Sequence, residues 1–237
     1  MSKKEVIIKK DFEEISTYTA FLIEDIVKKI KNKKSGKINI AFSGGNTPIL
    51  MFEKLTRLTN LDWQDINIYL VDERYVRNNH KDSNYNLLKE HLIRHINIPD
   101  ENVHYIKYLA EIKNSLKDYQ KQIVQGFKLK NEKQAPEFDL IHLGIGADGH
   151  TASIFQPGKI DNNQLLAVTR GKRYKRITFT YKILNNAKNI LFLITGKEKQ
   201  EIVSEIINNN NKDYAAAEVD NKGKLYYLLD KEASLNL

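Results

Sequence analysis

The segment GIGADGHTASIF at residues 144–155 carries the strongest chemical signal in this chain of 237 residues. Its glycines allow close backbone approach, and His150 follows Asp148 and Gly149 directly. We expect Asp148 to cap a helix that begins here, with His150 in its first turn. The helix dipole would then favour the neutral imidazole, which can accept a proton near neutral pH. The segment therefore predicts a general base at His150.

A second group of chemically active side chains follows the apolar run INIYLV at 66–71. The charged or titratable members of this group are Asp72, Glu73, Arg74, Arg77 and His80. Ionised side chains at the end of a buried strand are costly unless they pair with one another or bind something. A surface ion pair and a functional site are the two interpretations, and we favour the functional site.

The loop SGGNTP at 43–48 places two glycines between an apolar run and an amphipathic stretch. Free backbone N–H groups and a helix dipole at such a place can bind a phosphate. A tight turn with Asn46 or Thr47 as the helix cap and Pro48 in the first turn explains the loop equally well. Neither a Walker A sequence nor a G-x-G-x-x-G pattern is present, which argues against a nucleotide triphosphatase.

The remaining histidines and lysines carry weaker signals. His91, His95, His104 and His142 lie in ordinary helix or strand patterns, and we expect them to be structural. No H-E-x-x-H or comparable cluster is present, so we expect neither a metal nor another cofactor. Lys199 follows Thr195-Gly196 by one turn and taken alone would be a solvated lysine.

Apolar runs alternate with amphipathic stretches and must position these loops. Strands are predicted at 37–42, 66–71, 138–145 and 189–194, with shorter ones at 5–9, 103–106, 176–180 and 225–229. Helices are predicted at 12–31, from Thr47 onward, and at 82–96, 110–128 and 197–207. The alternation predicts a three-layer α/β/α, Rossmann-like fold with a mostly parallel sheet. Because ligands bind beyond the carboxyl ends of such strands, the site is expected at the loops 43–47, 72–83, 146–151 and 195–199.

Composition excludes several classes of protein. The chain has 38 Lys+Arg against 30 Asp+Glu, a net charge of +8, no cysteine and 41% hydrophobic residues, which is typical of a globular protein. The lack of cysteine excludes a disulfide framework and thiolate catalysis. No apolar run approaches the ~18 residues of a membrane span. We expect one domain over residues 1–237, located in the cytoplasm.

The densest basic cluster lies at residues 170–176, where five cations occur within seven positions without an acid among them. Its cations are Arg170, Lys172, Arg173, Lys175 and Arg176. No helix-turn-helix, RNA-recognition or zinc module accompanies the cluster. A small anion is therefore favoured as the partner over a nucleic acid or a membrane, and the role of the cluster beyond Arg176 stays open.

Four segments in this order resemble the 6-phosphogluconolactonase family, which shares a wider fold group with the glucosamine-6-phosphate deaminases. The segments are SGGNTP, LVDERYV with DSNYNLL, FDLIHLGIGADGHTASIF and RITFTYKILNNAKNILFLITGKEK. The resemblance runs from about Lys37 to Glu201 and faintly on to 226–233. It implies a metal-independent hydrolase that converts 6-phospho-D-glucono-1,5-lactone to 6-phospho-D-gluconate, the second step of the oxidative pentose phosphate pathway. The oligomeric state, monomer or homodimer, is left open.

The resemblance also implies roles for individual residues. The phosphate loop of the family falls on Ser43, Gly44, Gly45 and Thr47. Its DER and DGH segments fall on Asp72, Arg74, Asp148 and the catalytic His150, and its later basic positions on Arg176 and Lys199. Either Asp72 or Asp148 would orient the imidazole. Backbone N–H groups at 146–149 are candidate donors to the oxyanion.

Two other functions stay open at this stage. Glucosamine-6-phosphate deaminases resemble the chain through the same phosphate loop and DGH, but they continue with a glutamate-containing stretch after the histidine. Here the continuation is TASIFQ at 151–156, and DERYV replaces the deaminase DEY, so the lactonase is favoured. A non-catalytic protein that senses sugar phosphates or binds nucleic acid is the third hypothesis, since fold alone does not determine function.

Overall fold

The computed structural model describes residues 3–33 and 35–237, and its centre is a seven-stranded sheet with the strand order β1-β10-β9-β6-β2-β3-β5. Every pairing in this sheet is parallel. The strands are β1 (Lys3–Lys9), β2 (Ile38–Phe42), β3 (Ile66–Leu70), β5 (Val103–His104), β6 (Leu140–Leu143), β9 (Asn189–Ile194) and β10 (Lys224–Asp230). All residues of β2, β3 and β6 are buried, as is usual for parallel strands covered on both faces.

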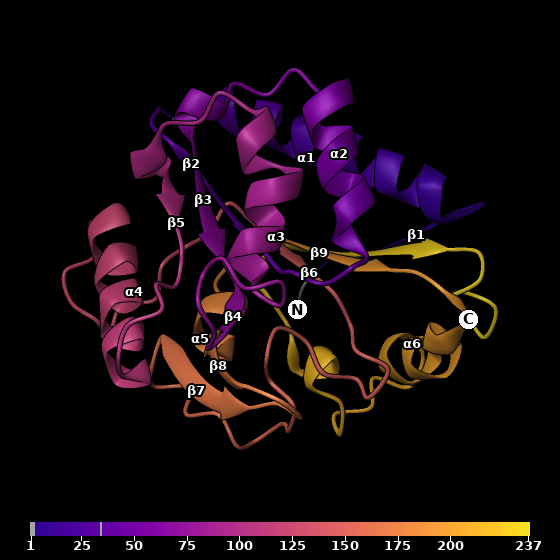
Figure 1. Cartoon of the computed structure of the whole chain (residues 1–237). Coiled ribbons are helices and arrows are strands. Elements are labelled where there is room, and N and C mark those ends of the chain that lie inside the picture. The colour runs from indigo at the N-terminus through magenta and orange to yellow at the C-terminus, as the bar shows by residue number, and fades with distance from the viewer. Residues whose placement is uncertain (1–2, 34) are drawn as a thin grey trace.

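Helices cover both faces of the sheet (Figure 1). One face carries α1 (Phe12–Lys31), α2 (Pro48–Leu58) and α3 (Asn84–His91); the other carries α4 (Ile112–Gly126), α5 (Tyr181–Leu184) and α6 (Gln200–Ile207). Each side has its own hydrophobic cluster, one with Phe42 and Phe52, the other with Tyr119 and Phe179. The predicted three-layer α/β/α fold is therefore confirmed.

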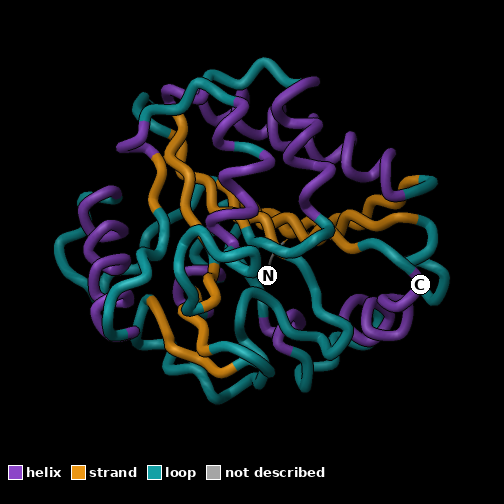
Figure 2. Tube along the Cα trace, in the orientation of Figure 1, coloured by secondary structure: helices purple, strands orange, loops and turns teal. Residues whose placement is uncertain are grey.

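A second, three-stranded antiparallel sheet lies on the same side as α4, α5 and α6 (Figure 2). Its strands are β4 (Asp72–Arg74), β8 (Lys175–Phe179) and β7 (Leu166–Arg170), in the order β4-β8-β7. The sequence analysis predicted only β8, at 176–180. The pairing places Asp72 opposite Thr178 and Arg74 opposite Arg176, so two segments about 100 residues apart in the chain meet beside the main sheet.

Most predicted elements are present with small shifts at their ends. The predicted helix over 82–96 is shorter, because α3 ends at His91 and is followed by a separate 3-10 turn. Its N-cap is Ser83, whose side chain accepts a hydrogen bond from the backbone of Asn86. The predicted helix at 197–207 begins as a 3-10 turn before α6. The 3-10 turns are Trp63–Asp65, Ile93–His95, Asp100–Asn102, Lys197–Lys199 and Ala215–Glu218.

One prediction about the most informative loop is wrong. No helix follows Gly149: residues 146–165 form turns and loops, with one isolated bridge between Thr151 and Ile154. Asp148 therefore caps no helix, and His150 is not at a helix N-terminus. The glycines and small polar residues of this segment, which suggested a cap, serve a tight turn instead.

Among the described residues, no helix is both long enough and apolar enough to cross a membrane.

Candidate active site

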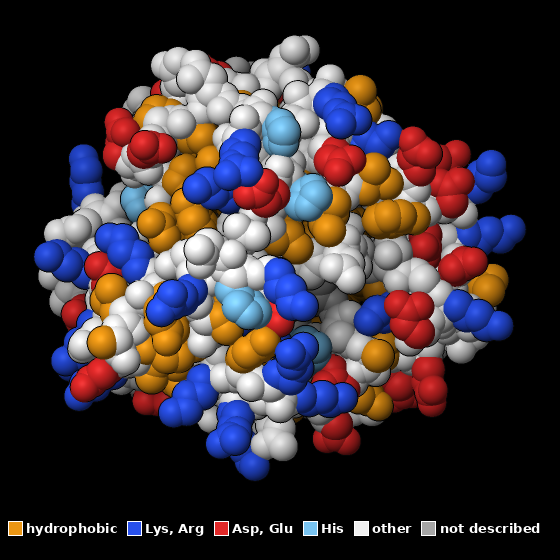
Figure 3. Space-filling model, viewed as in Figure 1, with side chains coloured by type: hydrophobic (Ala, Val, Ile, Leu, Met, Phe, Trp, Pro, Cys, Tyr) orange, Lys and Arg blue, Asp and Glu red, His pale blue; other side chains and the backbone are white. Residues whose placement is uncertain are grey.

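The loops that follow β2, β3, β6 and β9 surround a pocket of about 280 Å³ at the carboxyl edge of the main sheet. Figure 3 shows this face hollowed near its centre, with Lys, Arg and His side chains around the hollow. Nine of the predicted site residues line the pocket: Ser43, Gly44, Gly45, Thr47, Asp72, Arg74, His150, Arg176 and Lys199. Asp148 is the exception and lines an adjoining groove. Tertiary structure thus brings residues from five segments to one place.

His150 and Asp148 form a pair at the mouth of the pocket. The Nδ1 atom of His150 contacts Oδ1 of Asp148, and the His150 backbone N–H points at the same oxygen. Partial burial would raise the pKa of Asp148, but the hydrogen bond and the charge of His150 outweigh it and hold the pKa below its usual value. The Asp148 side chain is 59% exposed, so this pairing is partly screened by water. Asp72 makes no contact of this kind with His150.

A tight turn, and not a helix dipole, presents His150. The backbone N–H of Gly146 donates to the His150 carbonyl at 2.8 Å, and the N–H of Gly149 donates to the Gly146 carbonyl at 2.9 Å. These two N–H groups are therefore already used. For the N–H groups of Ala147 and Asp148, a role as oxyanion donors stays a prediction. A Cβ atom on Gly146 would lie 2.1 Å from Nδ1 of His150, so only glycine lets the imidazole approach here.

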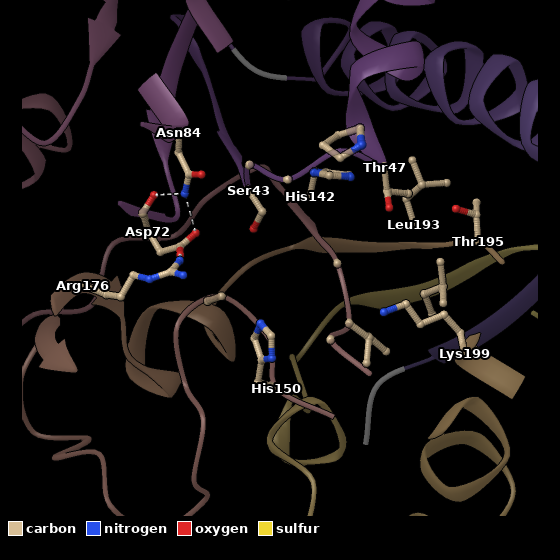
Figure 4. A pocket seen from close by; sticks show the side chains of 18 of the residues that line it. Ser43, Thr47, Asp72, Asn84, His142, His150, Arg176, Leu193, Thr195 and Lys199 are labelled. Carbon is tan, nitrogen blue, oxygen red and sulfur yellow. Dashed lines mark hydrogen bonds and ion pairs between the residues drawn. The ribbon is translucent and has the colours of Figure 1, made fainter. Parts of the chain in front are cut away.

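One wall of the pocket is a hydrogen-bonded network (Figure 4). Asp72 is buried and accepts hydrogen bonds from the side chains of Ser153 and Asn84, while the Arg176 guanidinium lies 3.7 Å from its carboxylate. Asn84 also donates to the Asp72 carbonyl at 2.8 Å and accepts from Nη1 of Arg74 at 2.7 Å. Burial lowers the pKa of Arg176, and the charge of Asp72 opposes that shift. We call Asp72, Arg74, Asn84 and Arg176 the network wall.

Glu73 supports this wall from behind. The residue is 2% exposed. Its carboxylate accepts four hydrogen bonds of 2.7–2.8 Å, from the backbone N–H groups of Arg74, Asn84 and Tyr85 and from the Ser83 hydroxyl. Burial raises the pKa of Glu73 to about 7, against these four donors, which favour the carboxylate. Glu73 thereby ties β4 to the start of α3.

The opposite wall is made of polar groups without partners. Ser43 and His142 are 6% and 1% exposed, and neither the Ser43 hydroxyl nor either His142 ring nitrogen has a hydrogen-bond partner among the described residues. Thr47 begins α2 without a side-chain cap bond. The Lys199 ammonium likewise has no counterion within the described part of the chain. We call Ser43, Thr47, His142 and Lys199 the open wall (Figure 4).

The amide N–H groups of Gly44 and Gly45 lie between the two walls and have no acceptor in residues 3–33 and 35–237. A Cβ on Gly44 would lie 2.1 Å from Oδ1 of Asn84. Glycine is therefore required where the phosphate loop passes the network wall, independently of any ligand.

Sequence reasoning missed two pocket residues. His142 was expected to be structural, but it lines the pocket; its place at the end of an apolar run, just before the 144–155 segment, was the available signal. Burial lowers the pKa of His142 to about 3, so the imidazole is neutral near neutral pH. Asn84 had no signal, because its partners are 10 and 12 residues away in another element.

His80, the other histidine in a candidate loop, is not part of the pocket lining. Its Nδ1 accepts a hydrogen bond from the Asp82 backbone at 3.0 Å, and its ring faces Tyr174. His80 therefore stabilises the loop locally. Among the described residues, no group of three or more His, Asp or Glu side chains could hold a metal ion.

The chain is similar to proteins of one known family. Residues 12–227 match the family described as glucosamine-6-phosphate isomerases/6-phosphogluconolactonase. The chain is 35% identical over 207 residues to a 6-phosphogluconolactonase of a Synechocystis species, covering 85% of each chain. It is 34% identical over 195 residues to the 6-phosphogluconolactonase of Thermotoga maritima, covering 80% of this chain and 84% of the other.

The solved structures agree as well. A crystal structure of 6-phosphogluconolactonase from Thermotoga maritima superposes with a TM-score of 0.85 at 31% identity, covering 97% of this chain and all of that one. The matched region contains the phosphate loop, both walls and the His150 turn. The chain therefore belongs to the glucosamine-6-phosphate isomerase/6-phosphogluconolactonase family.

Proposed function

We propose that this protein hydrolyses 6-phospho-D-glucono-1,5-lactone to 6-phospho-D-gluconate, with His150 as the general base. The observation that carries the proposal is the His150–Asp148 pair at the mouth of a pocket with cations and free amide N–H groups on its walls. The names of the relatives at 34–35% identity point to the same reaction. The reaction is the second step of the oxidative pentose phosphate pathway.

The pairing of His150 supports its role as a base. Because Nδ1 faces an ionised Asp148, the ring proton resides on Nδ1, and the lone pair of Nε2 is available. Nε2 takes a proton from water as the water oxygen attacks C1 of the lactone. Asp148 then stabilises the imidazolium. When the bond from C1 to the ring oxygen breaks, the imidazolium returns the proton to that oxygen, and the new carboxylic acid ionises.

The charges on the walls support recognition of a phosphorylated substrate. Arg74 donates a hydrogen bond to Asn84 and Arg176 is ion-paired with Asp72, whereas Lys199 has no counterion among the described residues. We therefore expect Lys199, with the N–H groups of Gly44 and Gly45, to contribute most to binding the phosphate dianion. Arg74 and Arg176 add positive charge on the other side of His150, and Asp72 holds Arg176 in place.

Glucosamine-6-phosphate deamination is the second candidate, because the family includes isomerases of that substrate. Among the described residues that line the pocket, Asp72 is the only carboxylate, and no glutamate is present. A ring-opening relay that uses a glutamate after the DGH segment is therefore not supported by this pocket.

The test is a direct assay of both substrates. Freshly generated 6-phosphoglucono-1,5-lactone should be hydrolysed well above the spontaneous rate, and glucosamine 6-phosphate should release no ammonia. His150→Ala should reduce kcat by about 10²–10⁴-fold, with unchanged circular dichroism. His95→Ala, at an exposed histidine outside the pocket, is the matched control. A folded His150→Ala variant with near-normal kcat would contradict the proposed base.

A further inference from the structure

A second groove, of about 670 Å³, adjoins the catalytic pocket. It lies between the 147–156 segment and the hairpin that joins β7 to β8, and it shares Arg74, His150 and Arg176 with the pocket. A solute lying in this groove would therefore be next to the predicted base before it entered the pocket.

The groove is strongly basic. The hairpin adds three exposed cations to those shared with the pocket: Arg170, Lys172 and Arg173. Arg170 and Lys172 have no ion pair within residues 3–33 and 35–237. The acids that line the groove are Asp82 and Asp148, and both already have partners. Positive charge is therefore left over on the hairpin side.

The β7–β8 hairpin is fixed in place by hydrogen bonds. β7 and β8 pair up to Arg170 and Lys175, and the turn is closed by a bond of 3.0 Å from the Gly171 N–H to the Tyr174 carbonyl. The Tyr174 hydroxyl donates to Asp82 at 2.7 Å, which links the turn to the loop before α3. The cations are thus presented along a fixed edge of the groove.

We propose that this groove is an outer anion-binding site that receives the phosphate of the incoming sugar phosphate before it reaches the catalytic pocket. The inference rests on the proposed function for the identity of the substrate. Arg173 lies 3.9 Å from the Asp82 carboxylate, but Arg170 and Lys172 have no ion pair among the described residues. A dianion is drawn to such a cluster of cations beside a cleft, and such fields raise association rates by about 10–10³-fold at low ionic strength. The effect of the groove on substrate association must therefore appear in kcat/KM more than in kcat, and salt must weaken this effect.

The test removes the three hairpin charges together, in Arg170→Gln/Lys172→Gln/Arg173→Gln. At low ionic strength kcat/KM for the phosphorylated lactone should fall about tenfold, and the difference from wild type should shrink as salt is added. Hydrolysis of glucono-1,5-lactone, which lacks the phosphate, should be affected far less. The charge-retaining Arg170→Lys/Arg173→Lys variant should keep the wild-type kcat/KM.

A control variant loses the same net charge elsewhere: Lys4→Gln/Lys33→Gln/Lys222→Gln. Lys4 is the second residue of β1, Lys222 precedes β10, and Lys33 precedes β2, so all three lie toward the amino ends of the strands, at the edge opposite the pocket. This variant should retain kcat/KM and its salt dependence. Equal losses in the two triple variants would overturn the proposal, because net charge alone would then explain them.

A binding measurement separates this inference from the proposed function. The affinity for 6-phosphogluconate, measured by calorimetry at low ionic strength, should weaken about tenfold in the hairpin variant, by the loss of unscreened charge, and stay unchanged in the control. This readout needs no turnover, so an inactive wild type would refute the proposed function alone. Unchanged affinity in a folded hairpin variant would refute the proposal that the groove binds anions.

Discussion

The two walls of the pocket differ in whether their polar groups have partners within the protein. On the network wall, Asn84 donates to the Asp72 carbonyl at 2.8 Å and the Arg176 guanidinium lies 3.7 Å from the Asp72 carboxylate, so its side chains are held by one another without a ligand. The buried Nε of Arg176 is the exception, since it has no hydrogen-bond partner among the described residues. On the open wall, Ser43 and His142 are buried and unpaired among the described residues, and Lys199 has no counterion there. Buried polar groups that lack partners carry a free-energy cost of about 1–3 kcal/mol each.

The difference separates residues that position the site from residues that bind the substrate. A preorganised network holds charge in a fixed place and loses little freedom when substrate arrives. Unpaired groups, by contrast, gain their hydrogen bonds only when a ligand or water supplies them. Changes on the network wall should therefore disturb geometry and stability, whereas changes on the open wall should weaken binding while leaving the free protein as stable as before, or more stable.

Among changes to the two walls, the largest effect is expected from Gly44→Ala. The added Cβ would lie 2.1 Å from Oδ1 of Asn84 and force this side chain away from Arg74 and Asp72. We expect kcat/KM to fall about 10²-fold, as for other displacements of about an ångström near a site, together with a lower Tm. Gly144→Ala is the control, since its Cβ would meet nothing within 4 Å. Equal activity in both variants would mean that the network wall does not position the site.

Acid pH should lower the stability of the protein, because the fold keeps His142 on the open wall neutral. Burial lowers the pKa of His142 to about 3, so between about pH 6.5 and 3 the unfolded chain binds a proton that the folded chain does not. Stability is therefore lost as pH falls through this window. From pH 7 to 5 the loss due to His142 is on the order of 2 kcal/mol.

The variant His142→Leu should remove this part of the acid sensitivity. Urea unfolding at pH 7 and pH 5 measures it: the difference between the two pH values should be smaller in the variant than in wild type. His104, whose pKa burial lowers to about 4, stays in both proteins and contributes equally. Parallel pH dependences would show that His142 is not held neutral by the fold.

Lys199→Met should raise KM about tenfold for the phosphorylated lactone, as expected for one charge-assisted contact. Its Tm should stay near that of wild type, because the ammonium has no partner among the described residues. Lys197→Met, an exposed lysine in the same 3-10 turn, should change neither quantity. A rise in KM of the same size for glucono-1,5-lactone would argue against a contact with the phosphate.

The smallest effect is expected from Ser43→Ala. KM should rise a few-fold, equivalent to about 1 kcal/mol for one lost hydrogen bond, while Tm should stay level or increase. Ser16→Ala removes another buried, unpaired hydroxyl, on α1 and outside the pocket lining, and should leave KM unchanged. If both variants leave KM unchanged, the Ser43 hydroxyl binds no substrate group.

Much of the fold and of the site was predictable from local signals. The apolar runs at 38–42, 66–70 and 189–194 form the expected strands, because parallel strands buried on both faces are nearly continuous runs of apolar residues. The helix expected at His150 is absent, because glycine and small polar residues suit a cap and a turn equally well. Only the backbone bonds of Gly146 and Gly149 distinguish the two.

The sequence by itself determined which loops meet at the carboxyl edge of the sheet and which side chains they bring there. It left open whether Asp72 or Asp148 faces His150. That choice depends on contacts between distant segments: Asp72 is held by Ser153, 81 residues away, and by Arg176 across the β4–β8 pairing. Such long-range contacts follow from the packing of the whole chain and leave no local pattern. Only the tertiary structure therefore decided that Asp148 pairs with His150, and that the side chains of one wall hold one another while those of the other lack partners.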